Sequence, residues 1–183
     1  MRSGRCNSRK GLAQVVTTLM LLAFSILLSG VAIYYSLNIV SVRLQTEDVR
    51  LTKQEIWVNS SGAVGAVMIQ NLGGKDLLID KIEVRGVEQA WTTVWFFRVA
   101  EGTSVSDAFN VTHYDNLTGS PTIDGRQYTQ GSSDLPLSSG RDMILYIKGP
   151  DNVQVQDIGT TISISLFTMN AQYITECNVK SAT

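Results

Sequence analysis

The chain has 183 residues, of which 44 % are hydrophobic and 17 % charged, and its formal net charge is −1. This composition excludes a disordered or collagen-like chain. The first ten residues hold four of the 15 Lys and Arg residues and no acid, which leaves 11 basic residues against 16 acidic ones in the rest of the chain. Because a nucleic-acid-binding protein carries a basic face on its folded part, we expect no nucleic-acid partner.

Residues for metal or covalent chemistry are scarce. Two cysteines, Cys6 and Cys177, and the single histidine, His113, are too few for a Cys/His metal cluster. No phosphate-binding loop, paired-carboxylate signature or nucleophile motif occurs, and His113 is better explained as a solvated or capping residue than as a catalytic one. We therefore expect no catalytic, cofactor-binding or metal-binding residues and no enzymatic activity.

An apolar segment follows the basic leader. No charged residue occurs between Lys10 and Arg43, and 22 of the 31 residues from Leu12 to Val42 are apolar. A helix of about 20 such residues crosses a bilayer. Basic residues before the segment and acidic residues after it predict a cytoplasmic N-terminus and an exported remainder.

The apolar pattern continues past the length that a membrane requires. Leu37, Val40, Leu44 and Leu51 keep the spacing of one helix face. A helix from Leu12 to Leu51 would be roughly 60 Å long, twice the thickness of the hydrocarbon layer, so half of it needs a cover other than lipid. We divide the chain into a leader (1–11), an apolar helix for membrane insertion and polymerisation (12–47) and an extracellular head (48–183).

The stretch Arg9-Lys10-Gly11-Leu12-Ala13-Gln14, followed by VVTTLMLLAFSILLSGVAIYYSLNIV, resembles the class III signal peptide of archaeal type IV pilins and archaellins. The resemblance covers residues 9–50. It implies that Arg9 and Lys10 are the basic pair, that a prepilin peptidase cuts after Gly11, and that Leu12 is the mature N-terminus. The glutamate that bacterial pilins carry five residues into the mature chain is replaced by Val16, which favours an archaeal pilin.

The resemblance also implies a function. The precursor would be a membrane protein, and the pilus assembly machinery would pull mature subunits into a homopolymeric filament on the cell surface, with adhesion or surface interaction as its role. Two other functions stay open: an archaellin or minor pilin, and a membrane-anchored ectodomain that binds a ligand or polysaccharide. Two other processing routes also stay open, namely an uncleaved signal anchor and conventional signal cleavage after Ala32.

Small residues within the apolar segment favour close packing between helices. Ser25 and Ser29 lie four residues apart, Gly30 follows directly, and Leu27 lies at the middle of the segment. We expect hydroxyl groups of the segment to bond to carbonyls of their own helix (Thr17, Thr18, Ser25 and Ser29).

The pattern changes from about Asp48 onward. Alternating and short continuous apolar runs, separated by turn residues, predict β-strands at 49–58, 63–70, 77–85, 91–100, 107–114, 142–148, 158–168 and 171–179. The predicted fold is α+β, with a long N-terminal helix followed by an antiparallel β-sandwich or barrel head of about seven to eight strands. The segment 116–141 lacks a sustained period and is interpreted as a long exposed excursion.

Three Asn-x-Ser/Thr sequons begin at Asn59, Asn110 and Asn116, all in the exported part. They are candidate glycosylation sites, although the same residues also suit turns. 

The aromatic residues between 91 and 97 are expected to fill the core rather than to form a sugar-binding platform. Alternation places Trp91, Trp95 and Phe97 on one face of a strand and Phe96 on the other. We expect Cys177 to be a small buried hydrophobic residue, with an intermolecular disulfide as the alternative.

Overall fold

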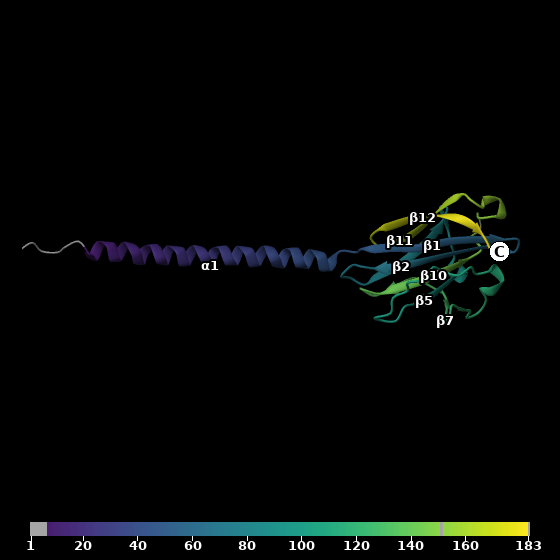
Figure 1. Ribbon diagram of the computed structural model, residues 1–183, viewed down its shortest axis with the longest axis horizontal. Coiled ribbons are helices and arrows are strands. Elements are labelled where there is room, and N and C mark those ends of the chain that lie inside the picture. Colours follow the sequence, from purple (N-terminus) through teal and green to yellow (C-terminus); the bar gives the residue numbers. More distant parts are fainter. Residues whose placement is uncertain (1–6, 151, 183) are drawn as a thin grey trace, which may run out of the picture. The chain divides into compact units, whose positions relative to one another are not determined.

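The computed structural model describes residues 7–150 and 152–182 and, for residues 7–10 and 42–45, the backbone alone. It divides into two compact units, a helical unit that ends at Leu44 and a head that begins at Gln45 (Figure 1). Cys6 and the first basic residues of the leader lie outside the described residues.

The helical unit is a single helix, α1 (Asn7–Gln45), of 39 residues. Such a helix is about 58 Å long at 1.5 Å per residue. It includes Gly11 rather than beginning after it, because one glycine costs a helix only about 1 kcal/mol. α1 ends at Gln45, close to the predicted boundary at residue 47. The helix spacing does not continue to Leu51 as its pattern suggested, since Leu51 lies in the first strand, β1 (Val49–Asn59). The physical reason is the Asp48 carbonyl, which accepts backbone hydrogen bonds from a distant loop and so holds the chain against the sheet.

The four hydroxyl groups that were predicted to bond to their own helix do so. They donate to backbone carbonyls three or four residues earlier, at 2.7–2.9 Å, and belong to Thr17, Thr18, Ser25 and Ser29. The side chains of the apolar segment therefore present no unsatisfied hydroxyl donor at these positions.

The head contains twelve strands in its described residues. After β1 they are β2 (Gly62–Asn71), β3 (Leu77–Val84), β4 (Val87–Glu88), β5 (Val94–Arg98), β6 (Thr122–Ile123), β7 (Arg126–Gln127), β8 (Thr129–Gln130), β9 (Leu135–Leu137), β10 (Asp142–Lys148), β11 (Thr161–Thr168) and β12 (Gln172–Ser181). Three short 3-10 helices accompany them, η1 (Trp91–Thr93), η2 (Tyr114–Asn116) and η3 (Val155–Asp157). Seven strands have five or more residues, which confirms the predicted α+β class and strand number.

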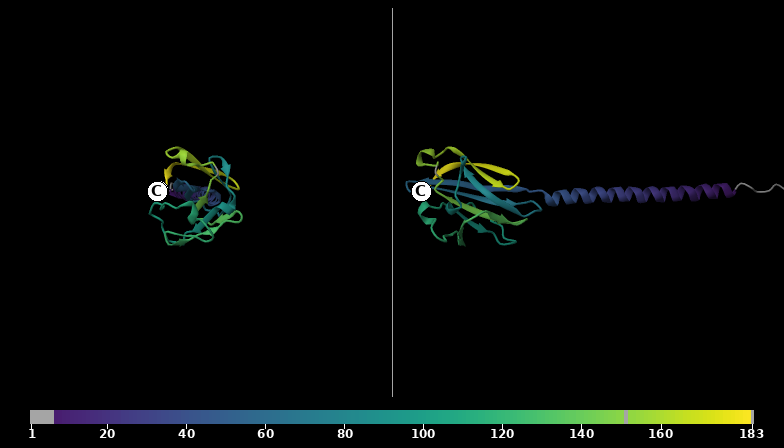
Figure 2. Two further views of the ribbon diagram at one scale, coloured as in Figure 1. Left: turned by 90° about the vertical axis from the view of Figure 1, so that its right-hand side faces the viewer. Right: turned by 180° about the vertical axis from the view of Figure 1, so that it is seen from behind.

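Ten strands form one curled sheet in the order β4-β3-β11-β12-β1-β2-β10-β5-β8, with β9 beside β3, and β6 pairs only with β7. Every pairing is antiparallel except that of β1 with β12, in which Ile56 lies opposite Val179. The views of the head show the sheet curling around its own inner face (Figure 2).

Two apolar clusters fill the head. The inner cluster lies inside the curl and takes residues from most of the long strands, among them Ile56, Ile69, Ile79, Leu145, Ile164 and Val179. The outer cluster lies on the other face of β1, β2, β5 and β10, and includes Trp57, Met68, Trp95, Ile144, Tyr146 and Phe109. Consecutive residues of β2 and β10 therefore face different clusters, which explains why both strands are apolar without alternation.

Two predictions about residues 107–141 of the head are wrong. Residues 107–114 form no strand, although Phe109 and Thr112 are buried there. The segment 116–141 is not an exposed excursion, because it contains strands β6–β9 and buries five large apolar side chains, Leu117, Ile123, Tyr128, Leu135 and Leu137. These side chains are spaced irregularly, so no period revealed that the segment covers the sheet.

The aromatic residues near β5 pack in or against the core as predicted, and all of them except Trp91 lie on the predicted faces. Trp95 is 3 % exposed and belongs to the outer cluster, with Phe97 packed against it. Trp91 packs with Phe96 against the inner cluster instead of sharing a face with Trp95. The difference arises because Trp91 lies in η1, where the chain turns and strand alternation does not apply.

Candidate functional site

Most of the exposed large apolar side chains that the structure describes lie on α1. Residues Gly11–Ser41 contain no charged side chain, and every one of them is exposed. This segment is long and apolar enough to cross a membrane. At 1.5 Å per residue its 31 residues span about 46 Å, whereas the hydrocarbon layer of a bilayer is about 30 Å thick.

The predicted packing residues fall into two groups. Ser25, Ser29 and Gly30 line a shallow apolar hollow on one side of α1, together with Leu22, Ile26 and Ile33. A Cβ atom at Gly30 would meet nothing within 4 Å, so the hollow is open to a neighbouring helix. Leu27 does not line this hollow and is 66 % exposed on another part of the helix surface.

The predicted processing residues lie near the start of α1. Gly11 is helical rather than extended, and Leu12 is 68 % exposed. A Cβ atom at Gly11 would also meet nothing within 4 Å. The side chains of Arg9 and Lys10 lie outside the described residues, so the basic pair stays a prediction from the sequence.

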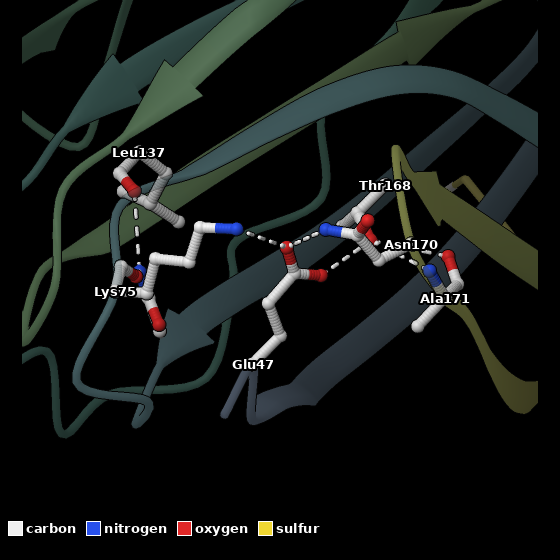
Figure 3. Close-up of polar contacts among 7 residues, drawn as sticks. Glu47, Lys75, Leu137, Thr168, Asn170 and Ala171 are labelled. Carbon is white, nitrogen blue, oxygen red and sulfur yellow. Dashed lines mark hydrogen bonds and ion pairs between the residues drawn. The ribbon is translucent and has the colours of Figure 1, made fainter. Parts of the chain in front are cut away.

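A polar cluster around Glu47 fixes the start of the head (Figure 3). The Glu47 carboxylate accepts hydrogen bonds from the Thr168 hydroxyl at 2.9 Å and from the Asn170 amide at 2.5 Å. The Lys75 ammonium lies 4.0 Å from the same carboxylate, whose side chain is only 10 % exposed. Residues 121 and 123 positions apart are joined here, so local sequence patterns gave no signal for this cluster.

The loop between β2 and β3 packs against the same stretch of chain. The buried Asn71 amide donates to the backbone carbonyls of Lys75 and Leu137 at 2.9 and 3.2 Å, and its carbonyl oxygen accepts from the Gly73 N–H. A Cβ atom at Gly73 would lie 2.6 Å from the Thr46 carbonyl oxygen, so only glycine fits there. These contacts hold the loop beside the chain segment that contains Glu47.

The three sequons lie on segments that meet at the far end of β1 from Val49. The Asn59 carbonyl oxygen accepts from the backbone N–H groups of Ser61 and Gly62, and its amide nitrogen lies 3.1 Å from His113 Nδ1. The amide of Asn59 is therefore committed to the β1–β2 turn, which is the turn-forming role that the sequence left open.

The other two sequons open onto one polar hollow of the surface. The Asn110 amide donates to the Asp124 carboxylate at 2.5 Å, and the sequon's Thr112 is only 3 % exposed. Asn116 is exposed, and its side chain makes no hydrogen bond to any part of the chain that the structure describes. Of the three asparagines, Asn116 thus has the freest amide.

Three buried groups have pKa values raised by their apolar surroundings. Desolvation raises the pKa of the Tyr128 phenol to about 12. Burial likewise raises the pKa of Tyr146, whose hydroxyl makes no hydrogen bond of normal geometry to a described residue, although the nearby Thr112 side chain lowers the pKa slightly. Cys177 is free and buried, as predicted, and desolvation raises the pKa of its thiol to about 11. A thiol in this environment is a poor nucleophile and a poor partner for an intermolecular disulfide.

In the described parts of the chain, no group of three or more His, Cys, Asp and Glu side chains could hold a metal ion. The arrangement is suited to surface contacts, since its prominent features are an uncovered apolar helix and a head with a complete core. Comparison with known proteins finds no matching family model and no matching curated protein.

Proposed function

We propose that the chain is a pilin, the structural subunit of an archaeal type IV pilus-like filament that is polymerised through α1. One observation carries this proposal: a charge-free helical segment of 31 residues, none of them buried, joined to a head that buries its own apolar residues. None of the side chains from Gly11 to Ser41 is buried against any part of the chain that the structure describes. The helix needs lipid or other helices to cover it.

In the proposed mechanism, filament assembly replaces the lipid around α1 by the helices of neighbouring subunits. In the membrane, lipid surrounds the apolar side chains of α1 at little cost. Once the subunit is extracted, the same surface must be buried against sister helices to avoid water, which favours a helical assembly of identical subunits. The self-bonded hydroxyl of Ser25 suits both environments, and the open hollow beside Gly30 offers a close approach to a neighbouring helix.

The length of the segment supports a filament over a simple anchor. A single-span anchor requires about 20 apolar residues. The charge-free segment exceeds this number by about half, and its outer part still carries exposed apolar side chains, with Leu37 65 % and Ile39 60 % exposed. Helix packing in a filament would cover this outer part, whereas a bilayer of ordinary thickness would not.

Processing follows from the proposed class. A prepilin peptidase would cut after Gly11 while the leader is cytoplasmic and the head is outside, and the assembly machinery would then add the mature subunit to a cell-surface filament. Adhesion or another surface interaction is the role that we assign to that filament.

The experiment that tests this proposal is N-terminal mass spectrometry of the native protein combined with negative-stain microscopy of cells with and without the gene. A mature N-terminus at Leu12 and filaments that disappear with the gene support the proposal. A chain that starts at Met1 and forms no filaments would instead identify a membrane-anchored ectodomain, and a start at Ile33 would identify conventional signal cleavage.

A matched pair of variants sharpens this test. Gly11→Leu adds a side chain where the structure leaves open space, so it should leave α1 intact while blocking recognition by the peptidase. We expect uncleaved precursor and no filaments. Ala13→Leu changes an equally exposed position of the same helix and should be processed normally.

We also propose that Asn116 is the glycosylated sequon of the head. Its amide is exposed and free of hydrogen bonds to described residues, whereas the amides of Asn59 and Asn110 are held by His113 and Asp124. The intact mass of native protein should exceed the polypeptide mass, and Asn116→Gln should remove the excess. If Asn110→Gln removes it instead, the assignment to Asn116 is wrong.

A further inference from the structure

A hollow of about 370 Å³ opens at the seam where β5 and β9, from opposite ends of the curled sheet, approach each other. One wall is the end of β5 with Val99 and Ala100, and the other is formed by β9 and the loop that follows it. Both charged side chains that line this seam hollow are arginines, Arg98 and Arg141. Two guanidinium groups in one hollow make it a candidate site for an anionic ligand.

Arg98 is held in place from both sides of the seam. Its Nε and Nη2 atoms each donate to the Pro136 carbonyl at 3.3 Å, so a side chain joins β5 to β9 where no backbone pairing does. The guanidinium carbon also lies 4.8 Å from the centroid of the Phe96 ring. Arg98 is paired with Met143 of the inner cluster, which places both side chains on the inner face of the sheet. An arginine restrained in this way loses less freedom when it binds a ligand.

Arg141 ends a tight loop that is also fixed. Its N–H donates to the Ser138 carbonyl at 3.2 Å, and the Ser139 N–H donates to the Asp76 carboxylate at 2.8 Å. The Nη2 atom of Arg141 lies 2.8 Å from Glu101 Oε2. The Glu101 side chain is 84 % exposed and that of Arg141 37 %. This ion pair is therefore a surface contact, which water and salt weaken.

Most guanidinium donors of the seam hollow are uncommitted. Arg98 Nη1 and the Nε and Nη1 atoms of Arg141 donate to no residue that the structure describes. Asp142, the next residue after Arg141, lies opposite Gln70 of β2, and its carboxylate accepts from the Gln70 amide at 3.3 Å. Among the described residues, Glu101 is thus the one acid that forms an ion pair with either arginine.

The seam hollow suits a carboxylate that carries an apolar or ring-shaped body. A guanidinium group binds a carboxylate through two parallel N–H···O hydrogen bonds. The Glu101 contact shows that a carboxylate reaches Arg141 at a good hydrogen-bond distance. Pro136 and Ala100 are exposed on the walls and offer apolar contacts to the rest of such a ligand. Inorganic phosphate has no part that would use them.

We propose that the seam hollow binds an organic carboxylate of the sugar-acid class, and that Glu101 is a built-in competitor that the ligand displaces from Arg141. The inference concerns the head alone and goes beyond the proposed function. It holds for a filament subunit and for a membrane-anchored ectodomain alike.

The test uses the full chain in a non-ionic polyoxyethylene detergent and saturation-transfer difference NMR with sodium glucuronate as the probe. We expect saturable binding, with contacts from the ring protons of glucuronate. Glucose has a similar ring without the carboxylate and should bind at least about tenfold more weakly, because it lacks the charged hydrogen bonds. Inorganic phosphate at equal concentration should not displace glucuronate.

Variants of the three charged residues assign the binding to the seam hollow. Arg98→Gln and Arg141→Gln should each weaken glucuronate binding by about tenfold or more. Glu101→Gln should strengthen it by about two- to fivefold, the strength of an exposed ion pair. Arg85→Gln is the matched control, because Arg85 is 45 % exposed and also forms an ion pair, with Asp157 at 3.2 Å. It should leave the affinity unchanged.

Each contrary result would overturn a stated part of the proposal. Unchanged affinity in Arg141→Gln would place the sugar acid elsewhere, and unchanged affinity in Glu101→Gln would remove its role as a competitor. Phosphate that displaces glucuronate would overturn the preference for an organic carboxylate, and the absence of saturable binding would overturn the whole proposal. A misfolded head cannot gain affinity, so Glu101→Gln stays decisive if the loss of Arg98 disturbs the seam. Filament formation is scored separately by microscopy, so failure of the proposed function leaves this result unaffected.

Discussion

Apolar side chains are exposed on the helix and mostly buried in the head. All residues of the charge-free helical segment are exposed, whereas the head places its apolar side chains in an inner and an outer cluster in which Leu145, Ile147 and Tyr146 are 0 % exposed. The head therefore gains hydrophobic stabilisation from its own residues. The helix can gain it only from lipid or from another chain.

The two units also differ in the range of the contacts that hold them. Hydrogen bonds within α1 join residues four apart, so the helix is specified by its local sequence. In the head, β1 pairs with β12 at Ile56 and Val179, and Glu47 bonds to Thr168 across 121 residues. Damage to the helix should leave the head folded, and damage to the head should leave the helix able to insert.

The largest expected effect comes from a charge on the helix. Leu27→Arg places a cation at the middle of the charge-free segment, where insertion into a bilayer costs about 2.5 to 3.5 kcal/mol. We expect filaments to disappear while the head keeps its β structure. Microscopy scores the filaments, and circular dichroism of the solubilised protein scores the head.

Leu27→Ile is the control for this variant, because it keeps an apolar side chain of equal size. It should assemble as the unchanged protein does. Normal filaments from Leu27→Arg would show that the polymer contacts lie on the head and that the helix has a different role.

The next effect is expected in the head alone. Leu145 is fully buried in the inner cluster, and replacing a buried leucine by alanine typically costs 2 to 5 kcal/mol. Leu145→Ala should lower the free energy of unfolding of the head by about this amount, as measured by denaturant titration of the detergent-solubilised chain. Leu28→Ala, at a helix position that is 70 % exposed, should leave that free energy unchanged. Equal effects of the two variants would contradict the separation of the units.

The contrast between the units also explains what the sequence could predict. The helix was predictable from its long charge-free apolar segment, β3 and β11 from alternation, and β2 and β10 from continuous apolar runs that indicate burial on both faces. The segment 116–141 was not, because its buried residues, such as Leu117 and Tyr128, follow no period and are buried only through contact with a sheet built from distant strands.

Some features of the candidate sites were likewise predictable from the local sequence, whereas others depend on long-range contacts. The sequons and the apolar segment could be read directly from residue types. The commitment of Asn59 to a turn, the Asn110–Asp124 contact and the Glu47 cluster depend on side chains that meet only after the sheet has formed. The predicted helix boundary at residue 47 lies two residues past the observed end at Gln45. The helix spacing that reaches Leu51 was misleading, because Leu51 fits a helix period locally while its pairing with Ile69 of β2 is a long-range contact.

A substitution at Tyr146 is expected to have a smaller effect than Leu145→Ala and to raise the free energy of unfolding of the head rather than lower it. Its hydroxyl is buried without a hydrogen bond of normal geometry in the described structure, although the Thr112 side chain lies beside it and lowers its pKa against the larger effect of burial. An unsatisfied buried polar group costs about 1 to 3 kcal/mol. Tyr146→Phe removes that group and keeps the ring contacts with Tyr128 and Phe109. We expect the head to gain roughly 1 kcal/mol in its free energy of unfolding.

Tyr128→Phe is the matched control for this gain. The Tyr128 phenol lies beside the charged Arg126, which lowers its pKa against the larger effect of burial, whereas the neighbour of the Tyr146 hydroxyl is the uncharged Thr112. The Tyr128 hydroxyl therefore has a stronger polar contact to lose. No stabilisation is expected from this variant. A loss of stability in Tyr146→Phe, measured by thermal unfolding, would show that the Tyr146 hydroxyl has a partner that contributes to the fold.

The smallest predicted effect is a dependence on acidic pH that the head shows and the helix does not. The Asp157 carboxylate accepts a hydrogen bond from the Gln154 N–H at 2.8 Å and lies 3.2 Å from the Arg85 guanidinium. The Gln154 hydrogen bond, followed by Arg85, holds the pKa of Asp157 below its usual value of 3.8. Because the folded pKa is lowered, the stabilisation is complete above pH 3.8 and is lost as the pH falls through the lowered pKa.

Hydrogen exchange at the Gln154 amide measures this effect at one site. Below about pH 3.8, exchange should accelerate beyond the intrinsic pH dependence, as the protonated carboxyl releases the amide and η3 opens. Asp157→Asn should abolish the added pH dependence, and Asp134→Asn, at an exposed aspartate, should leave it unchanged. The amides of residues 11–41 should show no such transition, because that segment has no titrating carboxylate. An equal acidic transition in the helix would mean that the two units unfold together, which contradicts their separate stabilisation.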